Sequence, residues 1–156
     1  MILIDAIYIH THGGLTILDS FINGIEKNPS VDINNFHFFI DDRIELSMIK
    51  RLKNYSIEHV KANHFNRKKA YEKKINLASK IVCLANIPPP IKLSKPVYIY
   101  FHNLLLLDNK TTYVTPFYFI LNKIKLQYIK FFRHKSYKWV VQTSFMKNKL
   151  SEILKI

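Results

Sequence analysis

The sequence predicts an α/β fold with a mostly parallel sheet. Short apolar runs rich in Ile, Val and Phe alternate along the chain with longer segments whose apolar residues recur at helical spacing. Runs that are apolar on both faces are typical of strands covered by helices on both sides. No internal repeat, low-complexity tract or linker interrupts this alternation, so residues 1–156 are expected to form one domain.

The first half of the chain predicts three strands and two helices. The opening run, residues 1–10, is followed by the glycine turn THGG and by a helix with apolar residues from Leu15 to Ile25. Further strands are predicted at residues 36–41 and 56–62. Between them, Asp41 and Asp42 stand where a helix cap is needed, ahead of the apolar residues Ile44, Met48, Ile49 and Leu52.

The second half continues the pattern with strands at residues 80–86, 96–103 and 138–144. Asn63 or Asn66 is expected to cap a helix over residues 67–80, and Thr143 or Ser144 a last helix over residues 145–155. Residues 115–135 fit both a helical face and strand alternation. Their length and Pro116 near the start favour a helix.

The net charge of +13 is distributed unevenly. Residues 1–49 carry −5, whereas residues 50–156 carry +18. Such asymmetry indicates a basic face for phosphates, anionic lipid or nucleic acid, although the abundance of Lys, Asn and Ile is also typical of an AT-rich genome. A basic helix face formed by Arg67, Lys68, Lys69, Lys73 and Lys74 is expected either to rest on an anionic membrane or to be simply solvated.

The sequence favours a cytoplasmic protein, soluble or peripheral to the membrane. It begins without the basic segment of a secretion signal, and no apolar stretch reaches the roughly 18 residues needed to cross a bilayer. The single cysteine, Cys83, excludes an intramolecular disulfide and lies in an apolar run, so we expect it to be a small buried hydrophobe.

Candidate site residues follow the predicted strands, because parallel sheets bind ligands at the carboxyl ends of their strands. Gly13 and Gly14 come after the first strand, where a glycine backbone can approach a phosphate or a sugar or merely form a tight turn. His12 and Asn86 also follow predicted strands, and His102 and Asn103 end the fifth. A histidine there can bind a sugar hydroxyl or act as a general base, or it can be structural.

Several common sites are not indicated. The sequence contains neither GxGxxG nor GxxxxGK[ST], so no dinucleotide fingerprint or P-loop is present. Asp41 and Asp42 could grip a ribose, although helix capping explains them as well. His10, His12, His37 and His64 do not have zinc-ligand spacing, so no metal site is expected.

Three segments resemble retaining GT-B glycosyltransferases of the "glycosyl transferases group 1" kind. ILIDAIYIHTHGGLTILDSFI is similar to their first strand, glycine loop and first helix. VCLANIPPPIKLSKPVYIYFHN resembles the stretch leading to their active-site histidine, and KWVVQTSFMKNKLSEIL resembles the strand and helix that close their N-terminal domain. The likeness covers essentially the whole chain and implies a Rossmann-like domain that is one half of a GT-B fold.

The resemblance implies transfer of a sugar from a nucleotide-sugar donor to a glycan or lipid-linked acceptor, without a metal ion or other cofactor. It places His102 at the reacting centre, and Gly13 and Gly14 near the donor phosphates or the transferred sugar. In the family a second domain holds the donor nucleotide. We therefore expect little transferase activity from this polypeptide without a C-terminal glycosyltransferase half.

Some features of the sequence fit two other functions. A non-enzymatic module binding nucleic acid or an anionic membrane is suggested by the basic excess, but only four of the 24 bases are Arg and the aromatics fall in apolar segments, which disfavours nucleic acid. A nicotinamide-dependent enzyme is suggested by the strand–glycine–helix opening, but the fingerprint is missing.

Overall fold

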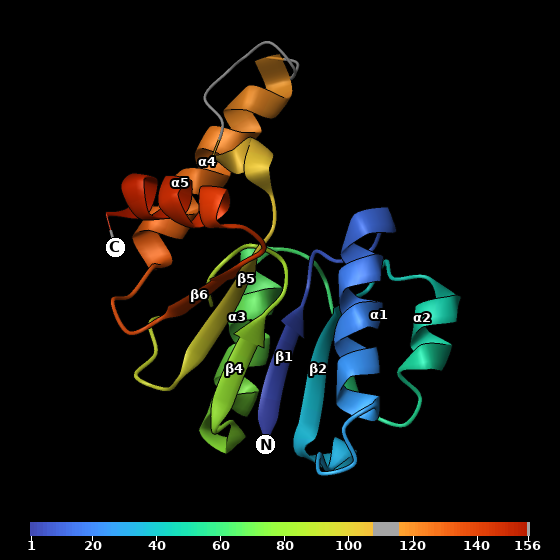
Figure 1. The fold of residues 1–156 in the computed structure, drawn as a ribbon. Helices are drawn as coiled ribbons and strands as arrows, with labels where there is room; N and C mark the ends of the chain where they lie inside the picture. The colour runs from blue at the N-terminus through green and yellow to red at the C-terminus, as the bar shows by residue number, and fades with distance from the viewer. Residues whose placement is uncertain (108–115, 156) are drawn as a thin grey trace.

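The computed structural model describes residues 1–107 and 116–155, and its centre is a parallel sheet (Figure 1). The strands are β1 (Ile2–Ala6), β2 (Phe36–Asp41), β3 (Ser56–Val60), β4 (Lys80–Cys83), β5 (Val97–Phe101) and β6 (Lys138–Val141). Their order across the sheet is β3-β2-β1-β4-β5-β6, and every neighbouring pair is parallel. This is the strand order of the doubly wound nucleotide-binding fold. The chain is a Rossmann-like α/β domain.

The parallel sheet and all six strands are confirmed, but most strands are shorter than predicted. Pairing in β1 ends at Ala6, because the backbone turns at Tyr8, whose φ of 77° is left-handed. The apolar run nevertheless continues through Ile7 and Ile9, which are buried without belonging to a strand. Hydrophobicity in the sequence reports burial, and it cannot mark where ladder hydrogen bonds stop.

One face of the sheet is covered by α1 (His12–Glu26) and α2 (Leu46–Arg51), as Figure 1 shows. Alternate residues of β1 point to opposite faces, and Ile4 and Ala6 pack on this one. Leu18 and Ile22 of α1 are fully buried against them. The helical spacing of the apolar residues after the first strand therefore predicted the correct face.

Both helix starts on this face differ from the predictions. Gly13 and Gly14 lie in the first turn of α1, which begins at His12 after the N-cap Thr11, rather than in a turn before the helix. The prediction that Asp41 and Asp42 cap the next helix is wrong, because α2 begins at Leu46 with Glu45 as its N-cap. Asp41 is instead buried and engaged by other partners, described below.

The opposite face is covered by α3 (His64–Lys74), which continues into the short 3₁₀ turn η2 (Ile75–Leu77). The side chain of Asn63 caps α3 by accepting a hydrogen bond from the amide of Asn66. Tyr71 and Ala78 are buried against Leu3 and Phe39 of the sheet, as their spacing predicted. Cys83 is fully buried in the same cluster, which confirms its predicted character.

Two further helices lie beyond the carboxyl end of β5 and beside β6 (Figure 1). They are α4 (Pro116–Phe132), which settles the ambiguous segment as a helix, and α5 (Ser144–Leu154), capped by Thr143. Ile129 of α4 packs with Leu150 and Leu154 of α5 and with Leu106 of the 3₁₀ turn η3 (Leu104–Leu106). Another 3₁₀ turn, η1 (Ile33–Asn35), precedes β2.

Candidate functional site

A pocket opens at the carboxyl edge of the sheet, beside the point where the strand order reverses between β1 and β4. Its volume is about 380 Å³. Each of the loops after β1, β4 and β5 contributes part of the wall, and α4 closes one side. The lining residues are Tyr8, Ile9, Thr11, Gly14, Ala85, Asn86, Ile87, His102, Asn103, Leu106, Ile124, Lys125 and Tyr128.

Four of the predicted substrate-contacting residues meet in this pocket, and two do not. Gly14 comes from the first turn of α1, Asn86 from the loop after β4, and His102 and Asn103 from the loop after β5, and all four line the one cavity. His12 and Gly13 occupy the exposed first turn of α1 and do not line it. Through Gly14, the start of α1 therefore lies at the same rim of the sheet as the end of β5.

Asn86 organises the end of β5. Its Oδ1 accepts hydrogen bonds from the backbone amides of His102, at 2.7 Å, and Asn103, at 2.9 Å. Asn86 itself has a left-handed φ of 65°, a conformation that Asn tolerates better than most residues. Two backbone N–H groups bond to one end of the Asn86 amide, so that end must be the oxygen. The other end, Nδ2, is therefore the one that faces the imidazole ring of His102.

This orientation also fixes the state of His102. Asn86 Nδ2 donates to His102 Nε2 across 3.2 Å, so Nε2 carries the lone pair and Nδ1 carries the hydrogen. Burial lowers the pKa of His102 below its usual value, which keeps the ring neutral at neutral pH. Its Nδ1 is buried and has no hydrogen-bond partner among the described residues. The ring also stacks on Tyr100, with 5.6 Å between the ring centres.

The loop after β1 is held by Asp41 at the end of β2. One Asp41 oxygen accepts a hydrogen bond from the Tyr8 amide at 3.1 Å, and the carboxylate forms two more with the Arg43 guanidinium, at 2.8 and 2.7 Å. Although burial alone would raise it, the pKa of Asp41 is lowered by these contacts with Arg43. With its carboxylate occupied in this way, Asp41 is a positioning residue for the pocket wall, and it is not free to bind a ribose.

Behind the pocket lies a buried ion pair that sequence reasoning missed. Asp5 of β1 and Arg67 of α3 are each 1% exposed, and their closest oxygen and nitrogen atoms are 2.7 Å apart. The Tyr71 hydroxyl donates to the same Asp5 oxygen at 2.6 Å. Burial alone would lower the pKa of Arg67, but the adjacent Asp5 carboxylate raises it above its usual range. The available signal was Asp5 itself, a lone charge within an apolar strand, which requires a buried partner.

Arg67 therefore does not belong to the outer basic face on which it was predicted. Lys68, Lys69 and Lys73 are exposed as predicted, and Lys74 is half-buried, but Arg67 points inward. Its guanidinium also approaches the Tyr128 hydroxyl, at 3.4 Å, and the Ile87 carbonyl, at 3.5 Å. Both of those residues line the pocket, so the ion pair supports its wall from behind.

The contribution of α4 to the site was also missed. Lys125 and Tyr128 supply an ammonium and a hydroxyl, and Ile124 adds an apolar wall. Burial raises the pKa of Tyr128 to about 12, although Arg67 lowers it, so the phenol keeps its proton at neutral pH. No short motif marks these residues, because only the packing of α4 across the strand ends brings them to the cavity.

Nothing in the described residues places three His, Cys, Asp or Glu side chains together as a metal ion would require. None of the helices in residues 1–107 and 116–155 is both long and apolar enough to traverse a membrane. No protein-family model, curated protein or solved structure matches the chain.

Proposed function

We propose that the chain forms one wall of a sugar-transfer cleft and holds the saccharide acceptor, in the manner of the N-terminal half of a GT-B glycosyltransferase. The observation that carries this proposal is the shared pocket of Gly14, Asn86 and His102 at the carboxyl edge of the sheet. These residues come from the segments whose sequence resembles that family. A pocket at the switch point of strand order is where open parallel sheets bind their ligands.

The chemistry of the lining suits a saccharide. Asn103, Thr11 and Lys125 supply amide, hydroxyl and ammonium groups, and the apolar side chains of Ile87 and Leu106 also line the pocket. Sugar rings present hydroxyl groups at their edges and apolar C–H faces, so they need this mixture of hydrogen-bonding groups and apolar surface. None of the Asp and Glu residues in the described part of the chain lines the pocket, which leaves it compatible with a phosphorylated substrate.

Within this proposal, His102 positions the sugar and does not remove a proton. Its Nε2 already accepts a hydrogen bond from Asn86, and its lowered pKa disfavours proton uptake. The Nδ1–H group has no partner among the described residues, and in this proposal it becomes a donor to a hydroxyl of the bound acceptor once the ring reorients. The donor phosphates would be held by a second domain, so the chain alone is expected to bind saccharides without turning over a nucleotide sugar.

The test is saturation-transfer NMR with a panel of methyl glycosides, UDP-glucose, GDP-mannose and NADH. Glycoside binding is expected to weaken about tenfold in Lys125→Ala and in His102→Ala, since each removes a polar contact from the pocket. Lys125 is exposed, so its removal leaves the core intact. The matched control is His59→Ala, an exposed histidine of β3 away from the pocket, which should bind like the natural protein.

The outcomes separate the candidate functions. Glycoside binding lost in both pocket variants and kept in His59→Ala supports the proposal. No glycoside binding, or binding that neither pocket variant weakens, contradicts it. Stronger binding of NADH than of any glycoside would favour a dinucleotide enzyme, and nanomolar, salt-sensitive binding of an oligonucleotide in a parallel titration would favour a nucleic-acid module.

A further inference from the structure

The outer face of α4 carries a stripe of large apolar side chains. Phe117, Ile120, Ile124 and Phe131 are 66%, 57%, 60% and 69% exposed, and their spacing in the sequence keeps them on one side of the helix. The opposite side attaches α4 to the domain through buried Ile129. A surface helix normally presents polar residues to water, so exposed apolar residues aligned along one side of a helix mark an interaction surface.

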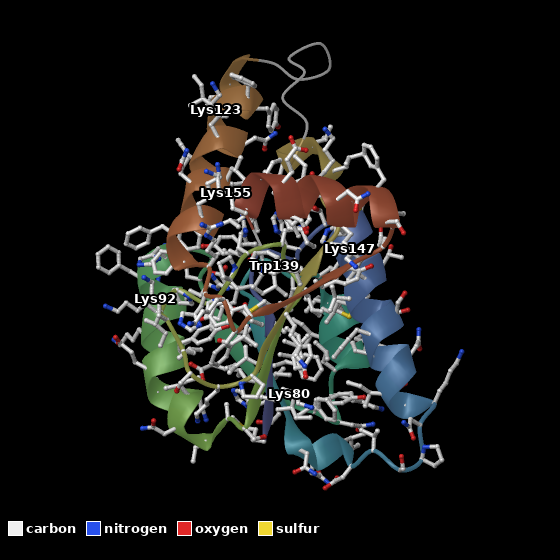
Figure 2. All side chains as sticks on the ribbon, turned by 60° about the vertical axis from the view of Figure 1, so that its left-hand side comes forward. Lys80, Lys92, Lys123, Trp139, Lys147 and Lys155 are labelled. Carbon is white, nitrogen blue, oxygen red and sulfur yellow. The ribbon has the colours of Figure 1, made fainter. Side chains whose placement is uncertain are left out.

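The stripe lies in a basic part of the described chain that contains no acidic residue. Residues 116–151 contain eight Lys and Arg residues and no Asp or Glu. By helical position, Lys123 and Lys130 flank the stripe on one side and Lys125 on the other. Lys92, from the loop before β5, reaches over the Phe131 ring, with its Nζ 5.8 Å from the ring centre. Figure 2 shows Lys92, Lys123 and Lys155 spread over this side of the molecule.

We propose that α4 docks the protein onto an anionic lipid bilayer. The stripe would enter the boundary between headgroups and acyl chains, while the flanking lysines meet lipid phosphates. Interfacial helices combine an apolar face with Lys or Arg beside it, and each base near an anionic surface adds favourable electrostatic attraction. The proposal rests on α4 and its charges, and it does not depend on the sugar-transfer function.

Charge decides between the possible occupants of this surface. A second copy of the chain would bring the same acid-free, strongly basic segment against its own kind, and like charges in contact oppose association. An anionic bilayer offers both an apolar interior and negative charge. The basic face of α3 was the membrane-binding candidate in the sequence, but it suits this role less well. Its exposed bases accompany no apolar stripe, and Lys68 pairs with Glu72 at 3.7 Å.

Docking through α4 also orients the pocket. Ile124 and Lys125 belong both to the face of α4 near the stripe and to the pocket lining. When the stripe rests on a bilayer, the pocket mouth therefore lies at the lipid surface. A ligand carrying a lipid tail would reach the pocket without leaving the membrane.

The experiment is co-sedimentation with vesicles of phosphatidylcholine, alone or in equal parts with phosphatidylglycerol. The natural protein is expected to bind the anionic vesicles, and added salt should weaken binding. Phe117→Ser/Ile120→Ser/Phe131→Ser removes three apolar anchors, and Lys123→Glu/Lys130→Glu reverses two charges. Each is expected to lower the partition coefficient by roughly tenfold or more. None of these five residues lines the pocket.

The matched control is Leu46→Ser/Lys50→Glu on α2, which changes one exposed apolar residue and one exposed base away from α4. It should bind vesicles like the natural protein. Far-UV circular dichroism checks that each variant is folded. A second readout uses Ile120→Cys with an environment-sensitive fluorophore, because native Cys83 is buried and does not compete for the label. Its emission should shift to the blue on anionic vesicles, whereas a label at Leu46→Cys should not respond.

Several results would overturn the proposal. They are no binding to anionic vesicles, an equal loss of binding in the α2 control, or binding without any fluorescence change at position 120. Concentration-dependent dimerisation that disappears in the apolar variant, without vesicle binding, would assign the stripe to a second copy of the chain. Because no sugar is present, failure here leaves the glycoside test unaffected.

Discussion

Single polar residues fix the geometry of the pocket by ending or bracing strands. Asn86 uses one side-chain oxygen to hold the two amides that follow β5, and Asp41 holds the loop after β1. The ion pair of Asp5 in β1 and Arg67 in α3 supports the pocket wall through the contacts of Arg67 with Tyr128 and Ile87. Each of these side chains satisfies backbone or charged groups that burial would otherwise leave unpaired, so each position tolerates few replacements.

The Asp5–Arg67 pair gives the sharpest prediction at this scale. Asp5→Asn keeps the shape of the side chain but leaves the buried Arg67 guanidinium without a counter-charge, which is expected to cost about 3–5 kcal/mol of unfolding free energy. Urea denaturation followed by circular dichroism measures this cost. In Asp5→Asn/Arg67→Met the loss should be smaller than the sum of the single losses by at least about 1 kcal/mol.

Glu72→Gln is the control, since it breaks the exposed pair with Lys68 and should change stability far less. Additive losses in the double variant would show that Asp5 and Arg67 are not coupled.

Among the elements, α1 and α4 are the two that shape the site. The first turn of α1 sits directly against Ile9, and this close approach brings Gly14 to the pocket wall. Helix α4 crosses beyond the strand ends and adds Lys125 and Tyr128. The pocket therefore depends on how two helices are placed relative to the strand ends, in addition to the strand ends themselves.

Alanine substitutions in α1 test the close approach. A Cβ added at Gly14 would lie 3.2 Å from Cγ2 of Ile9, which is buried and has little room to move, whereas one added at Gly13 meets nothing within 4 Å. Gly13→Ala is expected to raise the unfolding free energy by about 0.5–1 kcal/mol through helix propensity, and Gly14→Ala to leave it unchanged or lower it.

Gly24→Ala, also with nothing within 4 Å, is the matched control and should be stabilising like Gly13→Ala. Thermal unfolding of the three variants ranks their stabilities. Equal stabilisation by Gly13→Ala and Gly14→Ala would rule out a tight contact at Ile9.

At the scale of the whole molecule, stability and charge are distributed unevenly. The central strands β1, β2 and β4 pack between helices on both faces, with Leu3, Ile4 and Phe39 fully buried. The first turns of α4 project beyond the sheet (Figure 1) and expose Phe117 and Ile120. The acidic residues 1–49 thus supply two of the buried central strands, whereas the exposed start of α4 belongs to the basic residues 50–156.

Hydrogen exchange read by mass spectrometry tests this distribution. Amides of β1 and β4 are expected to exchange only through global unfolding, and amides in the first two turns of α4 to exchange orders of magnitude faster through local opening, because few buried contacts hold them. Equal protection of β1 and the start of α4 would contradict this picture. Peptides from β1 and β4, measured in the same proteolytic digest, serve as the internal control.

Much of the fold could be predicted from the sequence, because burial on both faces leaves a period in the residues themselves. The six strands, the helices between them and their parallel arrangement follow from apolar runs alternating with helical stripes. The rule that ligands bind at the carboxyl ends of parallel strands also predicted Gly14, Asn86, His102 and Asn103 as candidate site residues, and all four line the pocket. Asn63 and Thr143 were each one of two cap candidates in the sequence, because a cap is a local contact, and the structure selects them over Asn66 and Ser144.

Only the tertiary structure decided the partners of the polar residues. Arg67 reads as one base among five on a helix, and its burial against Asp5 depends on a contact across 62 positions of the chain. The hydrogen bond of Asn86 to His102 and the placement of Lys125 and Tyr128 likewise join segments distant in sequence. The period of apolar residues shows which face of an element a side chain lies on. Which residue it contacts there depends on how whole helices and strands pack together, and this packing leaves no local pattern in the sequence.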